Sequence, residues 1–188
     1  IDNITYTYNE KNEIDGYLIT MLKPLSLEDE ETFDNEEIPE CLGMFIKLDL
    51  DGNLVFEKSV LINEYGSIDK IYPIYNDNDE FDGYIAIGTF LVDDRYNSTL
   101  VYYDKDLNIV FRKDEIADEG DLFYKDIVNI YDNGKHTGYA VLATSKIKSE
   151  FRWKLLKFDK EGNKEVVFDN ITFQYKKCNS ADMALVFE

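Results

Sequence analysis

A five-residue segment rich in isoleucine and tyrosine occurs four times in this chain. Its copies read ITYTY, IYPIY, IVNIY and ITFQY, and they occupy residues 4–8, 71–75, 127–131 and 171–175. Repetition at intervals of about fifty residues is typical of arrays in which each repeat buries its apolar face against its neighbours. The repeat therefore constrains the fold more than any other feature of the sequence.

Each of the first three copies is followed by the same series of segments. A short apolar segment comes next, and then a longer one of the form FIKLDLDGNLVF. These segments begin at Gly16, Gly83 and Gly138, and at Phe45, Leu100 and Leu155. The longer segments start 55 residues apart, and so do the second and third glycines. A spacing held this closely indicates a structural repeat.

The repeated segments have the composition of β-strands, because they are rich in Ile, Val, Tyr, Phe and Thr and are bounded by Asp, Asn and Gly. The second strand of the second unit is apolar on both faces. Tyr84 and Ala86 lie on one side of it, and Ile85 and Ile87 on the other. A strand buried on both faces needs a layer above and a layer below it. Blades stacked around an axis would provide these layers.

A short polar segment joins the third and fourth strands of each unit. The three segments are residues 51–53, 106–108 and 161–163. Asp, Gly and Asn tolerate the positive φ angles of tight hairpin turns, so hairpins are predicted here. Leu107 interrupts the pattern and predicts a looser turn in the second unit.

Pro73 lies within one copy of the first strand. Because proline cannot donate to a strand ladder, this position predicts that the first strand forms an edge of its sheet. In a four-stranded propeller blade that edge is the inner one, beside the central channel.

The whole motif resembles the repeats of bacterial secreted β-propeller proteins, in which a DGGY segment is followed by KLDxxGN. The matching residues are 82–84, Gly88 and 47–53. The chain departs from this pattern at residues 137–138, which read TG, and at residues 182–183, which read DM. The resemblance covers nearly the whole chain, and it implies a fold rather than an activity.

We therefore predict an all-β fold, a β-propeller-like array of four-stranded antiparallel blades that forms one domain over residues 1–188. Three complete blades are expected at about 1–58, 68–113 and 125–168, and the first two strands of a fourth at 169–188. Known propellers have at least about four blades, so the chain should not close on itself. Its exposed end faces should contact further repeats or another chain.

The formal net charge of −19 over 188 residues argues against a nucleic acid or an anionic membrane surface as partner. Cations or basic surfaces fit this charge better. No apolar run approaches the roughly 18 residues of a spanning helix, and no signal peptide is present. The chain starts at Ile1 rather than Met, so we expect a mature or excised piece of an extracellular or cell-surface protein.

No sequence motif predicts a catalytic centre, a cofactor or a metal site. GxSxG, Walker-type and GxGxxG motifs do not occur. An EF-hand frame that starts at Asp49 places Leu54 where the loop needs glycine. Cys41 and Cys178 lack metal-ligand spacing, and their disulfide state stays open. The lone His136 is expected in an exposed turn.

An aspartate stands one or two residues before each first-strand isoleucine. These residues are Asp2, Asp69, Asp126 and Asp169. If the first strands line a channel, the four carboxylates meet near one mouth and could hold a cation or the basic end of a ligand. In the structural alternative, each carboxylate accepts loop N–H groups where its strand begins.

An acidic insertion interrupts the first unit over about residues 27–40. The distance from Gly16 to Phe45 is 29 residues, against 17 between the matching positions of the next two units. The candidate binding residues of the insertion are Glu28, Asp29, Glu30, Glu31, Asp34, Glu36 and Glu37. Loops on a rigid scaffold often bind partners, although a charged loop can also be merely solvated.

The predicted function is a non-catalytic binding or scaffold module that recognises a protein or carbohydrate partner through its loops. The alternative is a propeller-type glycoside hydrolase with carboxylates on its inner strands. Two or three carboxylates within roughly 5 to 10 Å of each other, in a pocket beside these strands, would favour the hydrolase.

Overall fold

Every regular element of the described chain is a β-strand. The computed structural model describes residues 2–24, 41–60, 66–147 and 150–171. Its strands are β1 (Asn3–Tyr8), β2 (Ile14–Pro24), β3 (Cys41–Asp49), β4 (Leu54–Val60), β5 (Gly66–Tyr75), β6 (Phe81–Val92), β7 (Arg95–Tyr103), β8 (Ile109–Glu115), β9 (Asp121–Asp132), β10 (Lys135–Ile147), β11 (Glu150–Asp159) and β12 (Lys164–Ile171). The predicted all-β class is confirmed.

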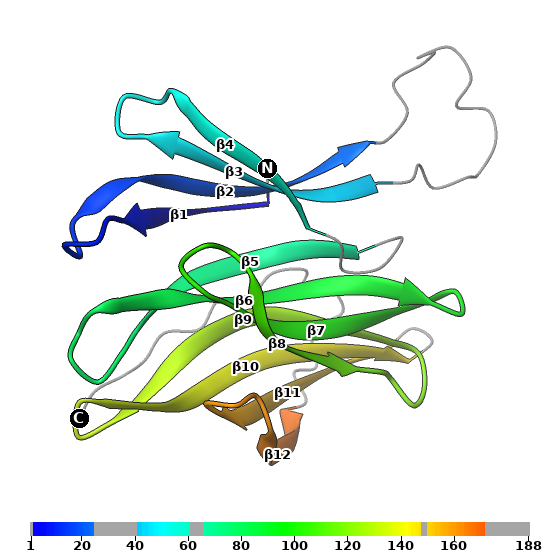
Figure 1. The fold of residues 1–188 in the computed structure, drawn as a ribbon. Helices are drawn as coiled ribbons and strands as arrows, with labels where there is room; N and C mark the ends of the chain where they lie inside the picture. The colour runs from blue at the N-terminus through cyan, green and yellow to red at the C-terminus, as the bar shows by residue number, and fades with distance from the viewer. Residues whose placement is uncertain (1, 25–40, 61–65, 148–149, 172–188) are drawn as a thin grey trace, which may run out of the picture.

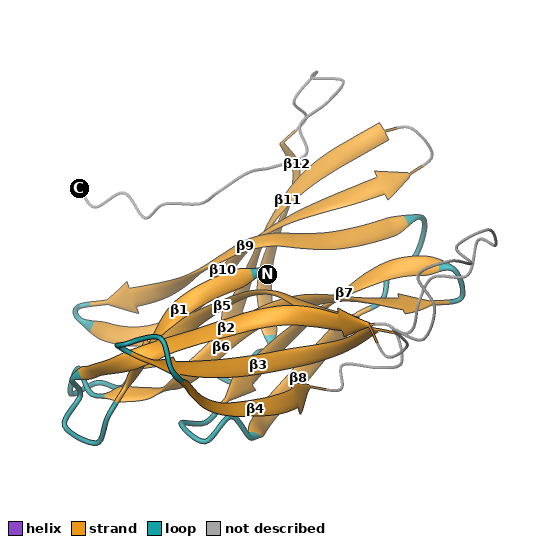
Figure 2. Cartoon of the chain, turned by 90° about the horizontal axis from the view of Figure 1, so that it is seen from above, coloured by secondary structure: helices purple, strands orange, loops and turns teal. Residues whose placement is uncertain are grey.

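These strands form three four-stranded antiparallel sheets, one from each repeat unit. Sheet I has the order β1-β2-β3-β4, sheet II the order β5-β6-β7-β8, and sheet III the order β9-β10-β11-β12. The sheets follow one another as layers, with sheet II between the other two (Figure 1). Seen from above, the strands of successive layers run across one another at an angle (Figure 2).

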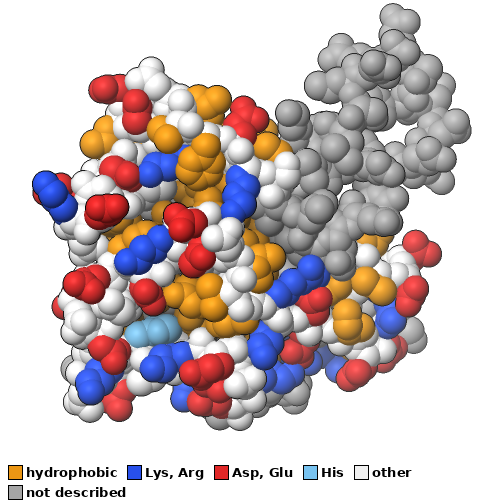
Figure 3. All heavy atoms as spheres, in the orientation of Figure 1, with side chains coloured by type: hydrophobic (Ala, Val, Ile, Leu, Met, Phe, Trp, Pro, Cys, Tyr) orange, Lys and Arg blue, Asp and Glu red, His pale blue; other side chains and the backbone are white. Residues whose placement is uncertain are grey.

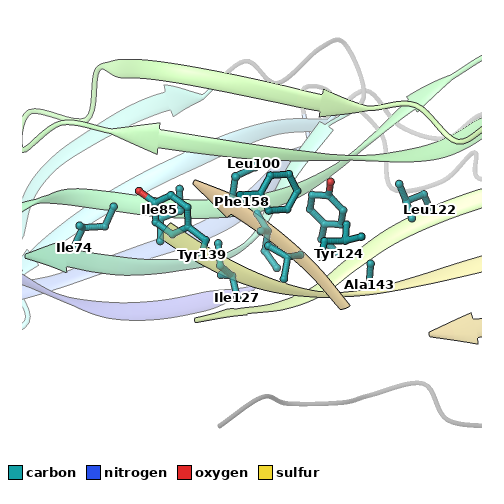
Figure 4. Close-up of a cluster of buried hydrophobic side chains, with 12 residues drawn as sticks. Ile74, Ile85, Leu100, Leu122, Tyr124, Ile127, Tyr139, Ala143 and Phe158 are labelled. Carbon is teal, nitrogen blue, oxygen red and sulfur yellow. The ribbon is translucent and has the colours of Figure 1, made fainter. Parts of the chain in front are cut away.

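Two buried clusters hold the layers together, one on each face of sheet II. Core A, between sheets I and II, consists of Leu18, Phe45, Ile68, Ile71, Phe81, Tyr84, Ala86, Phe90, Val101, Tyr103 and Leu107. Core B, between sheets II and III, consists of Ile74, Ile85, Ile87, Leu100, Leu122, Tyr124, Ile127, Tyr139, Val141, Ala143, Leu156 and Phe158. Figure 4 shows side chains of core B that meet between these two sheets.

The central strand β6 serves both cores, as its apolar pattern predicts. Tyr84 and Ala86 belong to core A, whereas Ile85 and Ile87 belong to core B. All four side chains are almost completely buried. Alternation along one strand therefore ties three layers together.

The motif glycine near the start of each second strand is required by a close approach of the neighbouring strand. A Cβ atom would lie 2.2 Å from the Tyr103 carbonyl oxygen at Gly83, and 2.1 Å from that of Phe158 at Gly138. Both glycines also have φ angles that side chains rarely adopt, +147° and +154°. This motif glycine thus serves the packing of strands within each sheet.

The turn at Leu107 is not looser than its counterparts, so that prediction was wrong. Leu107 has a φ angle of 61°, close to the 77° of Gly162 in the equivalent turn. The Asp104 N–H donates to the Asn108 carbonyl at 2.9 Å, and Asp159 and Asn163 form the same bond at 2.8 Å. Leu107 is buried in core A, and this burial offsets the cost of its left-handed backbone.

The strands are longer than the repeated segments suggested. The first strand of the second unit begins at Gly66 rather than Ile71, and it bends at an irregularity between Ile68 and Lys70. Pro73 lies in this edge strand, as predicted. Ile171 is the last residue of β12 and pairs with Trp153, although we expected it to open a fourth unit. The rest of that unit lies outside the described residues.

No helix that could cross a membrane occurs in the described parts of the chain.

Candidate functional site

Of the four aspartates before the first strands, Asp69 is held within its own sheet. Its carboxylate accepts hydrogen bonds from Ser67 Oγ at 2.6 Å and from Thr89 Oγ1 at 2.5 Å. Burial raises the pKa of Asp69, and the nearby charge of Asp2 adds to this rise. Asp2 itself is exposed. Because its charge acts on Asp69, the two aspartates lie near each other.

Asp126 instead connects two sheets. Its Oδ1 accepts from Lys70 Nζ and from Tyr72 OH on β5, each at 3.1 Å, and from the Ile127 N–H at 3.0 Å. The side chain is almost fully buried. Asp169 lies in β12 opposite Lys154, and its side chain is not described. The described contacts of Asp69 and Asp126 are those of carboxylates that stabilise strand packing.

The candidate residues of the acidic insertion lie outside the described residues. They are Glu28, Asp29, Glu30, Glu31, Asp34, Glu36 and Glu37. Their role stays a prediction.

A pocket of about 340 Å³ opens between sheets II and III, at the end of the layers where β5 turns into β6. Its walls come from the end of β5, from the β5–β6 turn, from β6, β7 and β10, and from the turn after β11. The lining residues are Ile74, Tyr75, Asn76, Asp77, Asn78, Asp82, Tyr102, His136, Tyr139 and Lys160. Sequence reasoning did not find this site, because its residues come from two repeat units and share no motif.

His136 is buried, so the expectation of an exposed turn residue was wrong. Its exposed fraction is 7%, and its ring packs between those of Tyr131 and Tyr139, at centroid distances of 5.5 and 4.9 Å. The turn is shorter than expected: β10 begins at Lys135, which pairs with Asp132. In Figure 3 the histidine, in pale blue, is seen on this face with carboxylates and lysines around it.

Burial lowers the pKa of His136, and the positive charge of Lys160 lowers it further. A hydrogen bond with the Gly138 backbone and the charges of Asp77 and Asp82 act in the opposite direction but do not outweigh these effects. The ring is therefore neutral near pH 7. Its Nε2 atom is buried and has no hydrogen-bond partner among the described residues.

The equivalent place between sheets I and II is closed by Asn12. Its Nδ2 donates to the Asp79 carbonyl at 2.9 Å, and its Oδ1 accepts from the Phe81 N–H at 2.8 Å. Phe81 stands 55 residues before His136 and packs against Tyr8 with a centroid distance of 5.1 Å. This amide links the β1–β2 turn to the β5–β6 turn.

The same link is missing from the described contacts between sheets II and III. Asp79 occupies the place of Asn12, with a φ angle of 59° against 62°. A carboxylate cannot donate a hydrogen bond as the Asn12 amide does. The β9–β10 turn, centred on Asn133 and Gly134, is also shorter. His136, the equivalent of Phe81, lines the pocket.

Asp82 is the best-fixed carboxylate of the pocket. The Tyr102 hydroxyl donates to its Oδ2 at 3.0 Å. In sheet I the equivalent Asp15 accepts from Lys47 Nζ at 2.8 Å instead. The partner of Asp82 is thus an uncharged hydroxyl, which does not balance the charge of the carboxylate. The partner of Asp15 is a lysine, which does balance it.

Chemically, the pocket combines hydrogen-bond acceptors with tyrosine rings, an arrangement suited to binding. No group of three or more His, Cys, Asp and Glu side chains in the described segments could hold a metal ion. A comparison with models of known protein families gives no match, and a comparison with curated proteins gives none either.

Proposed function

We propose that this chain is part of a β-propeller-type array that acts as a non-catalytic binding or scaffold module in a secreted or cell-surface protein. The observation that carries the proposal is the outer face of sheet I. Ile4 and Ile14 are exposed on this face, and they occupy repeat positions that are buried between layers in sheets II and III.

Ile4 shows the difference most clearly. Its side chain is 55% exposed, whereas the equivalent Ile71 and Ile127 are 0% and 1% exposed. Ile71 belongs to core A and Ile127 to core B, so each packs against the preceding sheet. Ile14 behaves in the same way, because it is 44% exposed and its equivalent Phe81 only 5%.

At some other positions, a residue that is exposed in sheet I is also exposed in sheet II. Val55 on β4 is 53% exposed, and its equivalent Val110 on β8 is 57% exposed. The outer strands thus present apolar side chains to solvent in both units, whether or not a sheet precedes them. The uncovered face around Ile4 and Ile14 has apolar residues at positions that pack against a neighbouring four-stranded sheet in the other units. Exposed apolar patches of this kind mark interaction sites.

The test is self-association of the isolated chain, measured by sedimentation velocity over a concentration series. We expect the chain to associate, and Ile4→Asp to weaken the association at least about tenfold, because a carboxylate would be buried at the contact. Val55→Asp adds the same charge on an exposed strand and should leave it unchanged. A wild-type chain that stays monomeric, or two variants with equal effects, would contradict the proposal.

A further inference from the structure

We propose that the pocket between sheets II and III binds a positively charged, hydrogen-bond-donating group of the size of a guanidinium. The proposal deepens the binding role proposed above by naming the class of ligand. It uses a different surface from the outer face of sheet I, so the two can fail separately.

The shape and walls of the pocket suit a small flat cation on a short apolar stem. Its volume of about 340 Å³ is at the lower end of the range of ligand pockets. Ile74 provides an apolar wall, and Tyr75, Tyr102 and Tyr139 provide aromatic ones. Guanidinium groups stack on aromatic faces and keep their charge there.

Two carboxylates among the lining residues provide hydrogen-bond acceptors. Asp82 is held in place by Tyr102 and can accept a further hydrogen bond, and Asp77 stands in the exposed turn above it. His136 adds a ring to the wall of the pocket rather than an acceptor, because its Nε2 atom is buried. A guanidinium has five donors and no acceptor, so it complements these groups.

Charge also favours a cation over an anion or a neutral sugar. Asp77 and Asp82 outnumber Lys160, the one cationic side chain that lines the pocket. The chain as a whole carries a net charge of −19, which raises the local concentration of cations. Lys160 is exposed, and its long side chain can turn away from a bound cation.

The repeat supplies a further reason. Between sheets I and II, the Asn12 side chain links the two turns and donates to a backbone carbonyl. Between sheets II and III the equivalent residue is Asp79, so this turn position supplies a carboxylate, which is an acceptor, instead of a donor.

The experiment is a titration of the ¹⁵N-labelled protein with N-acetyl-arginine amide, followed by NMR at physiological salt so that unspecific attraction is screened. We expect shifts of the amides of residues 74–78 and 136–139. The neutral citrulline analogue should bind at least about tenfold more weakly, since it keeps the shape but loses the charge.

Charge variants give the sign of the effect. Asp82→Asn should weaken binding about tenfold, because asparagine can still accept from Tyr102 while the charge is lost. Asp77→Asn should weaken it less, and Lys160→Gln should strengthen it. The matched control is Glu10→Gln in the equivalent β1–β2 turn of sheet I, which should leave binding unchanged.

Two sources could present a guanidinium, a protein side chain or a small molecule. Butylguanidine has the same charge and stem without the peptide groups, so tighter binding of N-acetyl-arginine amide would indicate a protein source and equal binding a small molecule. Equal affinity for the citrulline analogue, a preference for glucose, or stronger binding by Asp82→Asn would overturn the proposal. Each result leaves the association test of sheet I unaffected.

Discussion

At the scale of single residues, His136 shows how one substitution changes the character of a repeat position. Phe81 fills this position in sheet II and belongs to core A. The imidazole keeps the ring contacts but buries a nitrogen that has no partner in the described structure. An unsatisfied buried acceptor costs about 1–3 kcal/mol. Such a cost is typical of positions retained for binding.

We therefore predict that His136→Phe stabilises the protein by about 1 kcal/mol, because it removes the unpartnered nitrogen and restores the aromatic residue of the repeat. The measurement is urea unfolding at pH 7.5, with the reciprocal Phe81→His as control. That control should lose at least about 2 kcal/mol by burying a polar ring in core A. A less stable His136→Phe protein would show that the hydrogen bond between the imidazole and the Gly138 backbone outweighs the cost of the unpartnered nitrogen.

The same residue predicts a dependence of stability on pH. The folded-state pKa of His136 lies below the unfolded value of about 6.5, so the unfolded chain binds the proton more readily. The stability that the neutral ring provides is fully present at a pH above the unfolded pKa of about 6.5, and it is lost as the pH falls from there toward the folded pKa. The charges of Asp77, Asp82 and Lys160 act on the ring.

We expect the difference in unfolding free energy between wild type and His136→Phe to widen by about 1 kcal/mol between pH 7.5 and 5.5. Using the difference cancels the titration of the carboxylates that both proteins share. A constant difference across this range would mean that the ring has an ordinary pKa.

At the scale of elements, the hairpin turns show what the sequence specifies and what it leaves open. The positions of the three turns follow from Asp, Gly and Asn, because these residues tolerate the required φ angles. The conformation at Leu107 could not be predicted in this way, because the residue is buried in core A and its carbonyl accepts from Lys58 Nζ of sheet I at 2.8 Å. A contact with a distant layer overrides the local preference of the residue.

Leu107→Gly tests this balance. Glycine would relieve the left-handed strain, worth about 1–2 kcal/mol, but would remove a buried side chain worth about 2–5 kcal/mol. We expect a net loss of about 2 kcal/mol in thermal or urea unfolding. The matched change is Gly52→Leu, which has open space around it but a φ angle of +84°, and it should lose only the cost of strain. A Leu107→Gly protein more stable than wild type would show that the burial contributes little.

At the scale of the whole molecule, the repeat predicted the three four-stranded sheets of the described residues, because hydrophobic alternation and turn residues are local properties. The pocket could not be predicted, since its lining residues come from two repeat units and share no motif. The length of β5 also escaped prediction, because its first residues interact with neighbouring layers and carry no repeated motif. Features between sheets are thus harder to infer than those within a sheet.

The layered arrangement makes a last prediction about the distribution of stability. Both β2 and β6 have strands hydrogen-bonded on each side, so their amides are equally protected by the ladder. They differ in packing. Tyr84, Ile85, Ala86 and Ile87 of β6 are buried between two layers, whereas β2 buries Leu18 but leaves Ile19 partly exposed on its outer face.

In a stacked array, stability is approximately a sum of the unit stabilities and the interfaces between neighbours. Sheet II has two described interfaces and sheet I has one, so sheet I should open first. We expect native-state hydrogen exchange at the amides of β2 to be at least about tenfold faster than at those of β6, a difference of about 1.4 kcal/mol in opening free energy. Equal rates in the two strands would mean that the sheets unfold as one cooperative unit. In that case, binding of another sheet to the outer face of sheet I would slow hydrogen exchange equally in β2 and β6. If sheet I opens first, the same binding would slow exchange in β2 before it slows exchange in β6.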